Sequence, residues 1–224
     1  MTDGWTILES ALSLDEVAAI RAELTPLLDA TPFGTNSFVG MRTKRLFGLL
    51  AKTRVLDPLF IDARVLGLVE DVLGDVLLST AVAVEIHPGE AAQTLHTDGS
   101  AWPVPLDADE VVVNAIWALD DFRADNGATV MAGGRVAEMP AGSVLVYVGS
   151  LPHGGGANTT DSTRLAIVVG YTVAWIRQQE NYSLLCPPAM ARGLPAKLQE
   201  LLGYKLYPPF VGHVDGRDPG ELLR

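Results

Sequence analysis

The spacing of apolar residues predicts that the first third of the chain is largely helical. Residues 13–16 (Ser-Leu-Asp-Glu) fit a capping box, and apolar positions then recur at helical intervals to about residue 30. Similar patterns predict shorter helices over residues 45–53 and 62–73, the second of which is ended by a glycine. The chain is therefore expected to open with an amphipathic helix followed by two more.

From residue 76 onward the pattern changes to short runs rich in Val, Ile, Thr and Ala. The predicted strands cover residues 76–86, 111–119, 143–148 and 163–175, and Gly- and Pro-containing turns separate them. Short strands with frequent turns favour an antiparallel sandwich or barrel over an alternating α/β sheet. The predicted fold class is mainly β with flanking helices (α+β), followed by a tail of loops with one helix near residues 196–202.

Composition is typical of one globular domain. The 224 residues are 48% hydrophobic and 19% charged, with no repeat, linker or compositional break that would separate a second domain. We expect one domain over residues 1–224, with an N-terminal helical part over about 1–75, a β-barrel over about 76–176 and a C-terminal tail over about 177–224.

Charge limits the expected partners. Sixteen Lys and Arg against 27 Asp and Glu give a formal charge of −11, which disfavours binding to nucleic acid or an anionic membrane. Residues 34–56 are a local exception, because they carry five basic residues and no acidic one before position 57. This stretch is either a solvated helix face or a patch that faces a small anion.

Targeting signals are not evident in the sequence. Its apolar runs are too short to span a bilayer, and no basic region followed by an apolar stretch opens the chain. The single Cys186 has no partner for an internal disulfide. The expected location is cytoplasmic, and the pattern does not indicate an oligomeric state.

Two of the four histidines suggest a metal site. His96 and Asp98 are two residues apart, so on an extended strand their side chains would point to the same face. His153, which follows the strand over 143–148, is the natural third ligand. Two His and one carboxylate leave other positions of the ion open, an arrangement associated with non-haem iron(II) oxygenases. A surface His beside a solvated Asp is the alternative for the tripeptide alone.

The position of Arg164 supports the interpretation of these residues as a metal site. Arg164 follows His153 by eleven positions and begins an apolar strand, so its guanidinium would enter the interior beside the metal. A buried guanidinium needs an anion, and a dicarboxylate cosubstrate would supply one. Arg binds a carboxylate through two parallel hydrogen bonds, which Lys cannot form.

Together, several segments resemble the phytanoyl-CoA dioxygenase family of iron(II)/2-oxoglutarate-dependent oxygenases. The matching segments cover most of the chain: residues 38–45, 93–98 with Trp102 beyond them, 114–121 leading to 126–129, and 153–164 followed by Gly170-Tyr171. The resemblance implies a double-stranded β-helix, which is a jelly-roll, cupin-like barrel. It also implies Fe(II), 2-oxoglutarate and O2 as cofactor and cosubstrates.

The resemblance implies a role for particular residues. His96, Asp98 and His153 would bind the iron, and Arg164 would bind the distal carboxylate of 2-oxoglutarate. Residues expected to line the cosubstrate pocket are Gln93, Trp117, Thr129 and, from the helical region, Arg45, with Arg42 or Lys44 as alternatives.

Other positions are less distinctive. Relatives often carry Ser two residues after the distal His, where this chain has Gly155, so Thr129 is expected to supply the missing hydroxyl. Trp102 either stacks on substrate or packs in the fold. Asn114 either supports the metal ligands or is an ordinary strand residue at a bulge, and the second interpretation is preferred.

The expected function is a 2-oxoglutarate-dependent dioxygenase that oxidises a small organic substrate. Halogenating relatives replace the metal-binding carboxylate with a small residue, so the presence of Asp98 favours hydroxylation or a related oxidation, with 2-oxoglutarate converted to succinate and CO2. One alternative is a cupin-like isomerase or hydrolase that does not use 2-oxoglutarate. Another is a catalytically silent jelly-roll that binds a ligand. The N-terminal helices, the loop over 102–110 and the tail are expected to set the substrate.

Overall fold

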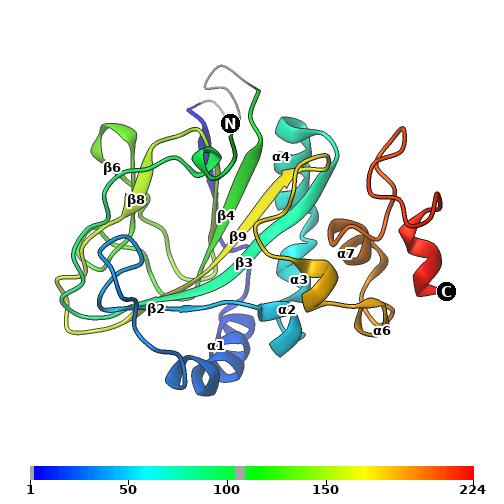
Figure 1. Cartoon of the computed structure of the whole chain (residues 1–224). Helices are drawn as coiled ribbons and strands as arrows, with labels where there is room; N and C mark the ends of the chain where they lie inside the picture. The colour runs from blue at the N-terminus through cyan, green and yellow to red at the C-terminus, as the bar shows by residue number, and fades with distance from the viewer. Residues whose placement is uncertain (1–2, 104–108) are drawn as a thin grey trace.

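The fold consists of two antiparallel sheets with helices against the larger one (Figure 1). The computed structural model describes residues 3–103 and 109–224, so part of the loop over 102–110 lies outside the described residues. The larger sheet has the strand order β1-β7-β4-β9-β3-β2, and the smaller has the order β6-β5-β8. The strands are β1 (Trp5–Leu8), β2 (Thr43–Leu46), β3 (Val76–Ile86), β4 (Val112–Ala118), β5 (Thr129–Met131), β6 (Arg135–Val136), β7 (Val144–Val148), β8 (His153–Gly155) and β9 (Arg164–Val173).

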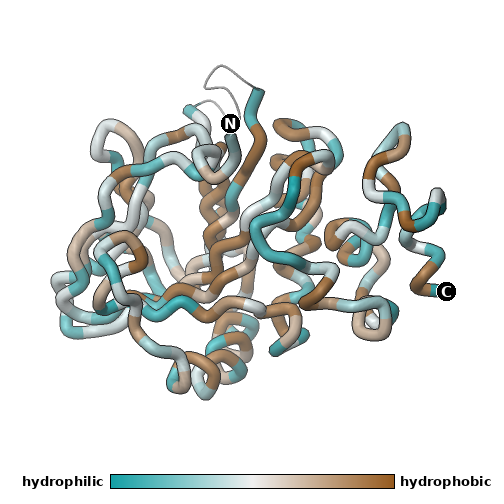
Figure 2. Tube along the Cα trace, in the orientation of Figure 1, coloured by the Kyte–Doolittle hydropathy of each residue, from teal (hydrophilic) through white to brown (hydrophobic). Residues whose placement is uncertain are grey.

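The helices pack mainly against one face of the larger sheet, as Figure 1 shows for α2, α3 and α4 beside β3 and β9. They are α1 (Leu14–Asp29), α2 (Leu49–Lys52), α3 (Asp57–Phe60), α4 (Ala63–Leu73), α5 (Tyr182–Leu185), α6 (Pro188–Ala191) and α7 (Ala196–Leu201). The described residues also form the short 3-10 helices η1 (Asp98–Ala101), η2 (Ala132–Gly134) and η3 (Pro219–Leu223). Hydrophobic positions continue along the strands at the centre of the molecule, and hydrophilic ones gather in the outer loops (Figure 2).

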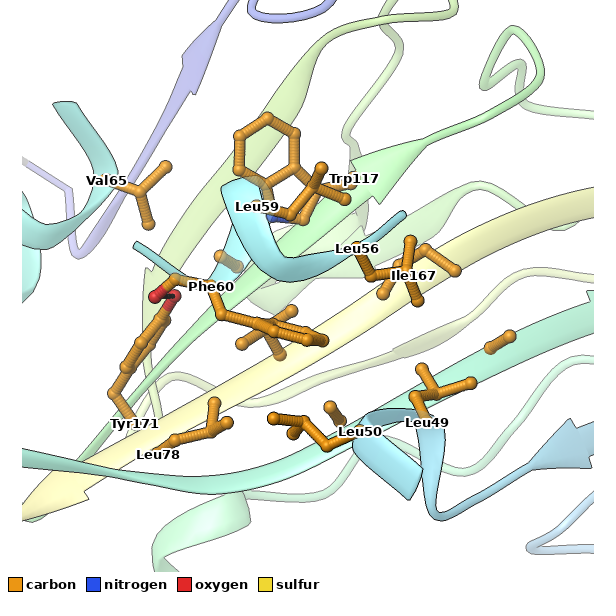
Figure 3. Packing of buried hydrophobic residues seen from close by; sticks show 14 of the residues in the cluster. Leu49, Leu50, Leu56, Leu59, Phe60, Val65, Leu78, Trp117, Ile167 and Tyr171 are labelled. Atoms are coloured by element: carbon orange, nitrogen blue, oxygen red, sulfur yellow. Dashed lines mark hydrogen bonds between the residues drawn. The ribbon is translucent and has the colours of Figure 1, made fainter. Parts of the chain in front are cut away.

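The principal core lies between the helices and this sheet. Leu59 and Phe60 of α3 lie over Trp117, Ile167 and Tyr171 of the central strands (Figure 3). The Tyr171 hydroxyl donates a hydrogen bond of 3.0 Å to the carbonyl of Phe60, so its buried polar atom is paired. Side chains alternate across a strand, so the residues between those of the core point to the other face, toward the smaller sheet.

Most of the predicted elements are confirmed. The first helix begins at the predicted capping box of Ser13 and Glu16, and α4 is capped by Asp62 and ends at Gly74. The long strand over 76–86 has the predicted bounds, and the other three predicted strands and the late helix agree to within two residues. The predicted mainly β fold with flanking helices is therefore confirmed.

The helix predicted over residues 45–53 is wrong in its first half. Residues 43–46 form strand β2, in which Arg45 lies opposite Val84 of β3, and the helix covers only Leu49–Lys52. Gly48 has a φ of +67°, a left-handed conformation that interrupts the chain between strand and helix. The N-terminal region also supplies β1, so it is not purely helical.

Among the described residues, no helix combines the length and the apolar character needed to cross a membrane.

Candidate metal centre and anion pocket

The three predicted metal ligands come together at one end of the two sheets. One ligand atom from each of His96, Asp98 and His153 lies within 4.8 Å of the others. Main-chain hydrogen bonds hold them: His96 and His153 exchange N–H···O bonds of 2.9 and 3.0 Å, and the Asp98 N–H donates to the carbonyl of Gly149. The sequence predicted an extended strand through His96 and Asp98. The structure has only a single β-bridge between His96 and His153, because Asp98 already begins the 3-10 helix η1.

Gly149 allows the segment that begins η1, at Asp98 and Gly99, to lie close to the sheet. A Cβ atom at this position would collide with the side chain of Val112 and would lie 3.4 Å from the backbone nitrogen of Gly99. Only a residue without a side chain fits such a close approach without movement of the backbone. The glycine thereby brings Asp98 within reach of His153, which begins β8.

Both histidines present the same ring nitrogen to the site. His153 Nδ1 lies 2.9 Å from the carbonyl of Leu151, and His96 Nδ1 lies 3.2 Å from the carbonyl of Thr94. A carbonyl only accepts, so each Nδ1 carries the proton when the ring is neutral, and each Nε2 keeps a free lone pair. Such outer contacts orient metal-binding histidines.

The Asp98 carboxylate has two unequal oxygens. Oδ2 accepts a hydrogen bond of 2.7 Å from Asn114 Nδ2, lies 3.4 Å from the Tyr147 hydroxyl, and is 3.3 Å from His153 Nε2. Oδ1 lies 3.6 Å from His96 Nε2. The Tyr147 hydroxyl also lies 3.1 Å from His153 Nε2.

These contacts shift the pKa values of the site. Burial raises the pKa of Asp98, but its hydrogen bond with His153 and the charges of both histidines outweigh burial and leave that pKa below its ordinary value. Burial lowers the pKa of His153, and the Asp98 carboxylate more than offsets this, so that pKa is raised. Burial and the nearby Asp98 raise the pKa of Tyr147, which keeps its hydroxyl protonated.

Arg164 opens into the same cavity as the three ligands. It is 4% exposed, its guanidinium lies 4.3 Å from the ring centroid of Phe122, and its Nη2 donates to the carbonyl of Gly127. Its Nε has no hydrogen-bond partner among the described residues. Burial lowers the pKa of Arg164 to about 9, although the charge of Asp120 opposes the shift. A buried guanidinium that lines a cavity is suited to bind a carboxylate there.

The cavity lies between the two sheets, has a volume of about 180 Å³ and is partly open to solvent. Three further predicted pocket residues, Arg45, Gln93 and Thr129, line it. Arg45 is the basic residue of its segment that faces the cavity, and burial lowers its pKa while Asp98 and Glu90 oppose that shift. Apolar walls are formed by Val84, Ile86, Ile116 and Val168.

Gln93 connects three parts of the site. Its Nε2 donates a hydrogen bond of 2.6 Å to the carbonyl of Phe38, and its Oε1 accepts one of 3.0 Å from the Gly155 N–H. The Phe38 ring packs edge-on against His96, with 4.9 Å between centroids. Gln93 therefore holds the loop that carries Phe38 against β8 and the metal ligands.

Trp117 does not line the cosubstrate pocket, and this prediction is wrong. Strand alternation sends its neighbour Ile116 to the cavity, whereas Trp117 is fully buried in the core beneath the helices. Figure 3 shows its indole among Leu59 and Val65 of the helical layer.

Trp102 and the remaining basic candidates also lie elsewhere. Trp102 packs against the cluster of Val111, Val112 and Val173, and its Nε1 donates to the carbonyl of Arg177. Trp102 is not among the described residues that line the cavity, and its stacking on a substrate stays a prediction. Lys44 donates to the carbonyl of Leu28 and Arg42 to that of Pro88, so neither faces the cavity.

Sequence reasoning missed Tyr147 and set Asn114 aside. Both are buried and stand opposite each other in the pairing of β4 with β7. The sequence offered no direct signal for either residue, because only the structure shows that Asn114 shares a strand face with the cavity residue Ile116. The preferred interpretation of Asn114 as an ordinary strand residue is wrong, since its amide contacts Asp98.

Comparison with known proteins identifies the family. A sequence profile described as phytanoyl-CoA dioxygenase (PhyH) matches residues 1–134, which is more than half of the chain. The chain belongs to the phytanoyl-CoA dioxygenase family. The sequence-based prediction of a dioxygenase of this family is thereby confirmed.

This phytanoyl-CoA dioxygenase family member is similar over nearly its whole length to fungal proteins named as dioxygenases. Dioxygenase olcK of Penicillium canescens is 28% identical over 257 aligned positions, which cover 98% of this chain and 85% of the relative. Dioxygenase swnH1 of Metarhizium robertsii is 29% identical over 99% of this chain and 85% of its own length.

Solved structures share the fold of this phytanoyl-CoA dioxygenase family member. HygX from Streptomyces hygroscopicus, crystallised with nickel, 2-oxoglutarate and hygromycin B, has a TM-score of 0.65 and 19% identity over 78% of this chain and 85% of its own. The non-haem α-ketoglutarate-dependent epimerase SnoN from nogalamycin biosynthesis has a TM-score of 0.67 and 19% identity, with coverages of 82% and 84%. The predicted jelly-roll architecture is thereby confirmed.

Proposed function

We propose that this chain is a non-haem iron(II)- and 2-oxoglutarate-dependent dioxygenase that hydroxylates a small organic substrate. The observation that carries the proposal is one cavity containing both the His96, Asp98 and His153 cluster and the buried, incompletely paired guanidinium of Arg164. A metal-binding cluster alone fits many reactions. A buried cation in the same cavity adds the requirement for an anionic cosubstrate.

The residues present fit the metal and the dicarboxylate. Two neutral imidazole nitrogens and one carboxylate are the donor set of the facial triad. Two guanidiniums, Arg45 and Arg164, line the cavity, and Asp98 is the one carboxylate among its described lining residues. A dianion would offset this excess of positive charge.

Iron(II) bound here would supply open coordination positions for 2-oxoglutarate and O2, and with them the oxidising power that converts 2-oxoglutarate to succinate and CO2. Arg164 would bind the distal carboxylate and set the cosubstrate's orientation. The apolar walls formed by Val84, Ile116 and Val168 would exclude water from that site.

The similar structures support a small organic substrate. They do not select one type of oxidation, so hydroxylation is our own proposal. HygX was crystallised with hygromycin B, and SnoN with Fe3+, α-ketoglutarate and nogalamycin RO. SnoN is an epimerase and SnoK a carbocyclase, so the fold also accommodates reactions other than hydroxylation. For this chain the Asp98 carboxylate argues against halogenation and so favours hydroxylation or a related oxidation.

Succinate formation tests the proposal without knowledge of the substrate. The purified chain is incubated with Fe(II), ascorbate, 2-oxoglutarate and air, and succinate is measured by mass spectrometry. We expect slow formation of succinate in the wild type and none above background in the Asp98→Ala variant. Iron binding without succinate, even with a library of small molecules, would instead favour a metal enzyme that does not use 2-oxoglutarate. Once a substrate is found, a gain of one oxygen in the product distinguishes hydroxylation from ring closure or epimerisation.

A further inference from the structure

Three residues form a row across the larger sheet beside the metal centre. Asn114 of β4 lies opposite Tyr147 of β7 on one side and opposite Gly170 of β9 on the other. Asn114 is 4% exposed and Tyr147 is 2% exposed, so both polar groups are shielded from water. A buried amide or hydroxyl is costly unless it is paired, and both of these groups reach the Asp98 carboxylate.

The two donors converge on a single oxygen of Asp98. Asn114 Nδ2 lies 2.7 Å from Oδ2, and the Tyr147 hydroxyl lies 3.4 Å from the same atom. No hydrogen bond to Oδ1 occurs among the described residues, and this oxygen lies 3.6 Å from His96 Nε2. Hydrogen bonding therefore makes the two carboxylate oxygens inequivalent before any ion is bound.

Gly170 provides space for the Asn114 amide. A Cβ atom at position 170 would lie 3.0 Å from Asn114 Oδ1 and 3.1 Å from Thr80 Cγ2, both closer than ordinary packing allows. The Asn114 side chain thus occupies a position that a larger residue on β9 would disturb. Its orientation toward Asp98 is built into the sheet.

We propose that Asn114 is a positioning residue that holds Asp98 Oδ2 and leaves Oδ1 as the metal-binding oxygen; this inference rests on the proposed function. A carboxylate held in this way binds the ion through one oxygen, which leaves another position of the ion for exogenous ligands. Contacts of this kind to a metal ligand commonly change metal affinity by about 10–100-fold.

Tyr147 has the smaller part in this arrangement. Its hydroxyl lies close to both His153 Nε2 and Asp98 Oδ2. When His153 Nε2 binds an ion, its lone pair is no longer free to accept a hydrogen bond. The Tyr147 hydroxyl can then donate only to Asp98 Oδ2 of these two atoms. The 3.4 Å separation is long for a hydrogen bond between oxygens, so removal of the hydroxyl has less effect than removal of the Asn114 amide.

The test measures Co(II) binding to the metal-free protein by calorimetry and visible absorption. Asn114→Leu keeps the branched shape of the side chain and removes the donor, and we expect its Kd for Co(II) to rise about 10–100-fold. We expect smaller increases for Tyr147→Phe and for Gly170→Ala, which keeps Asn114 but crowds its oxygen. The visible bands of bound Co(II) should also change in Asn114→Leu, because they report the number of ligand atoms.

A matched control separates positioning from general stability. Thr172 is a buried residue of the same sheet whose hydroxyl donates a 2.8 Å bond to the carbonyl of Val111, away from the metal centre. Thr172→Val should lower the melting temperature without moving the Kd or the spectrum. If Asn114→Leu does not fold, Gly170→Ala carries the same test.

The outcomes distinguish this inference from the function on which it rests. Wild-type affinity and an unchanged Co(II) spectrum in both folded Asn114→Leu and Gly170→Ala would overturn the positioning role alone. Failure of the wild type to bind Co(II) would overturn the proposed metal centre, and the inference with it.

Discussion

Ile116 and Trp117 are consecutive residues of β4 whose side chains point to opposite faces of the larger sheet. Ile116 forms part of the cavity wall beside the metal ligands, whereas Trp117 is fully buried beneath α3 and α4. The strand therefore connects the site to the main core through its backbone. We therefore expect a change at Ile116 to affect cosubstrate binding and a change at Trp117 to affect stability.

Trp117→Phe should reduce stability and leave the cosubstrate site intact. The smaller ring removes buried contacts, and the indole Nε1 has no partner to lose among the described residues. We expect a loss of about 1–2 kcal/mol, or a fall of about 2–8 °C in melting temperature. The Kd for 2-oxoglutarate should stay within about twofold of wild type, whereas Ile116→Ala should change it. A strong effect of Trp117→Phe on this Kd in a stable protein would contradict the assignment.

The strand alternation around Trp117 shows what the sequence could and could not reveal. The run of residues 111–119 is apolar at nearly every position because both faces are covered, so its pattern predicted a buried strand and not the direction of each side chain. Trp117 was assigned to the pocket from its place in a family motif. The pairing of β4 with β9 instead directs its side chain into the core.

Arg164 is expected to destabilise the fold in the absence of an anion. Its buried guanidinium has an unpaired Nε, and its pKa is lowered by burial. Arg164→Met, which keeps much of the side-chain length, should therefore have a melting temperature no lower than wild type without ligands. Addition of metal and 2-oxoglutarate should stabilise the wild type more than the variant. A metal-free variant much less stable than wild type would show that the guanidinium is already satisfied.

Gly155→Ser should strengthen cosubstrate binding. A Cβ at this position would meet Gln93 Oε1 at 3.4 Å and Ile86 Cδ1 at 3.8 Å, which are ordinary contacts, so the fold accepts the substitution. Gly155 and Arg164 line the same cavity, so one hydrogen bond from the added hydroxyl would lower the Kd for 2-oxoglutarate by about 2–10-fold. Gly155→Ala is the control and should leave the Kd unchanged. Weaker binding by the Ser variant than by the Ala variant would place the carboxylate elsewhere.

Metal binding should release protons and weaken in acid. The Asp98 carboxylate raises the pKa of His153, so this contact stabilises the metal-free fold fully below the ordinary His pKa and loses its contribution as the pH rises through the folded value. A metal ion needs the neutral ring, so its apparent affinity should rise with pH by up to about tenfold per unit while His153 is protonated. Calorimetry in buffers of different ionisation enthalpy counts the protons released. No release near the raised pKa would contradict His153 as a ligand.

The three candidate metal ligands and Arg164 could be singled out because each stands at a distinctive spacing in the sequence, and the fold brings them into one cavity. Tyr147 was not predictable in this way. It lies within an apolar strand, and its contact with Asp98 depends on how β7 pairs with β4 and on the turn at Gly149, which connects residues far apart in the chain.

The most direct test of the central claim is an anaerobic titration of Fe(II) and then 2-oxoglutarate into the metal-free protein. The visible absorption band of the iron–oxoacid chelate is followed in the wild type, Arg164→Met and Arg164→Lys. We predict a band in the wild type, 2-oxoglutarate affinity about a hundredfold lower in Arg164→Met, and an intermediate value in Arg164→Lys, which keeps the charge and loses the two-pronged geometry. Iron binding without a chelate band in the wild type, or equal affinities in all three proteins, would contradict the account.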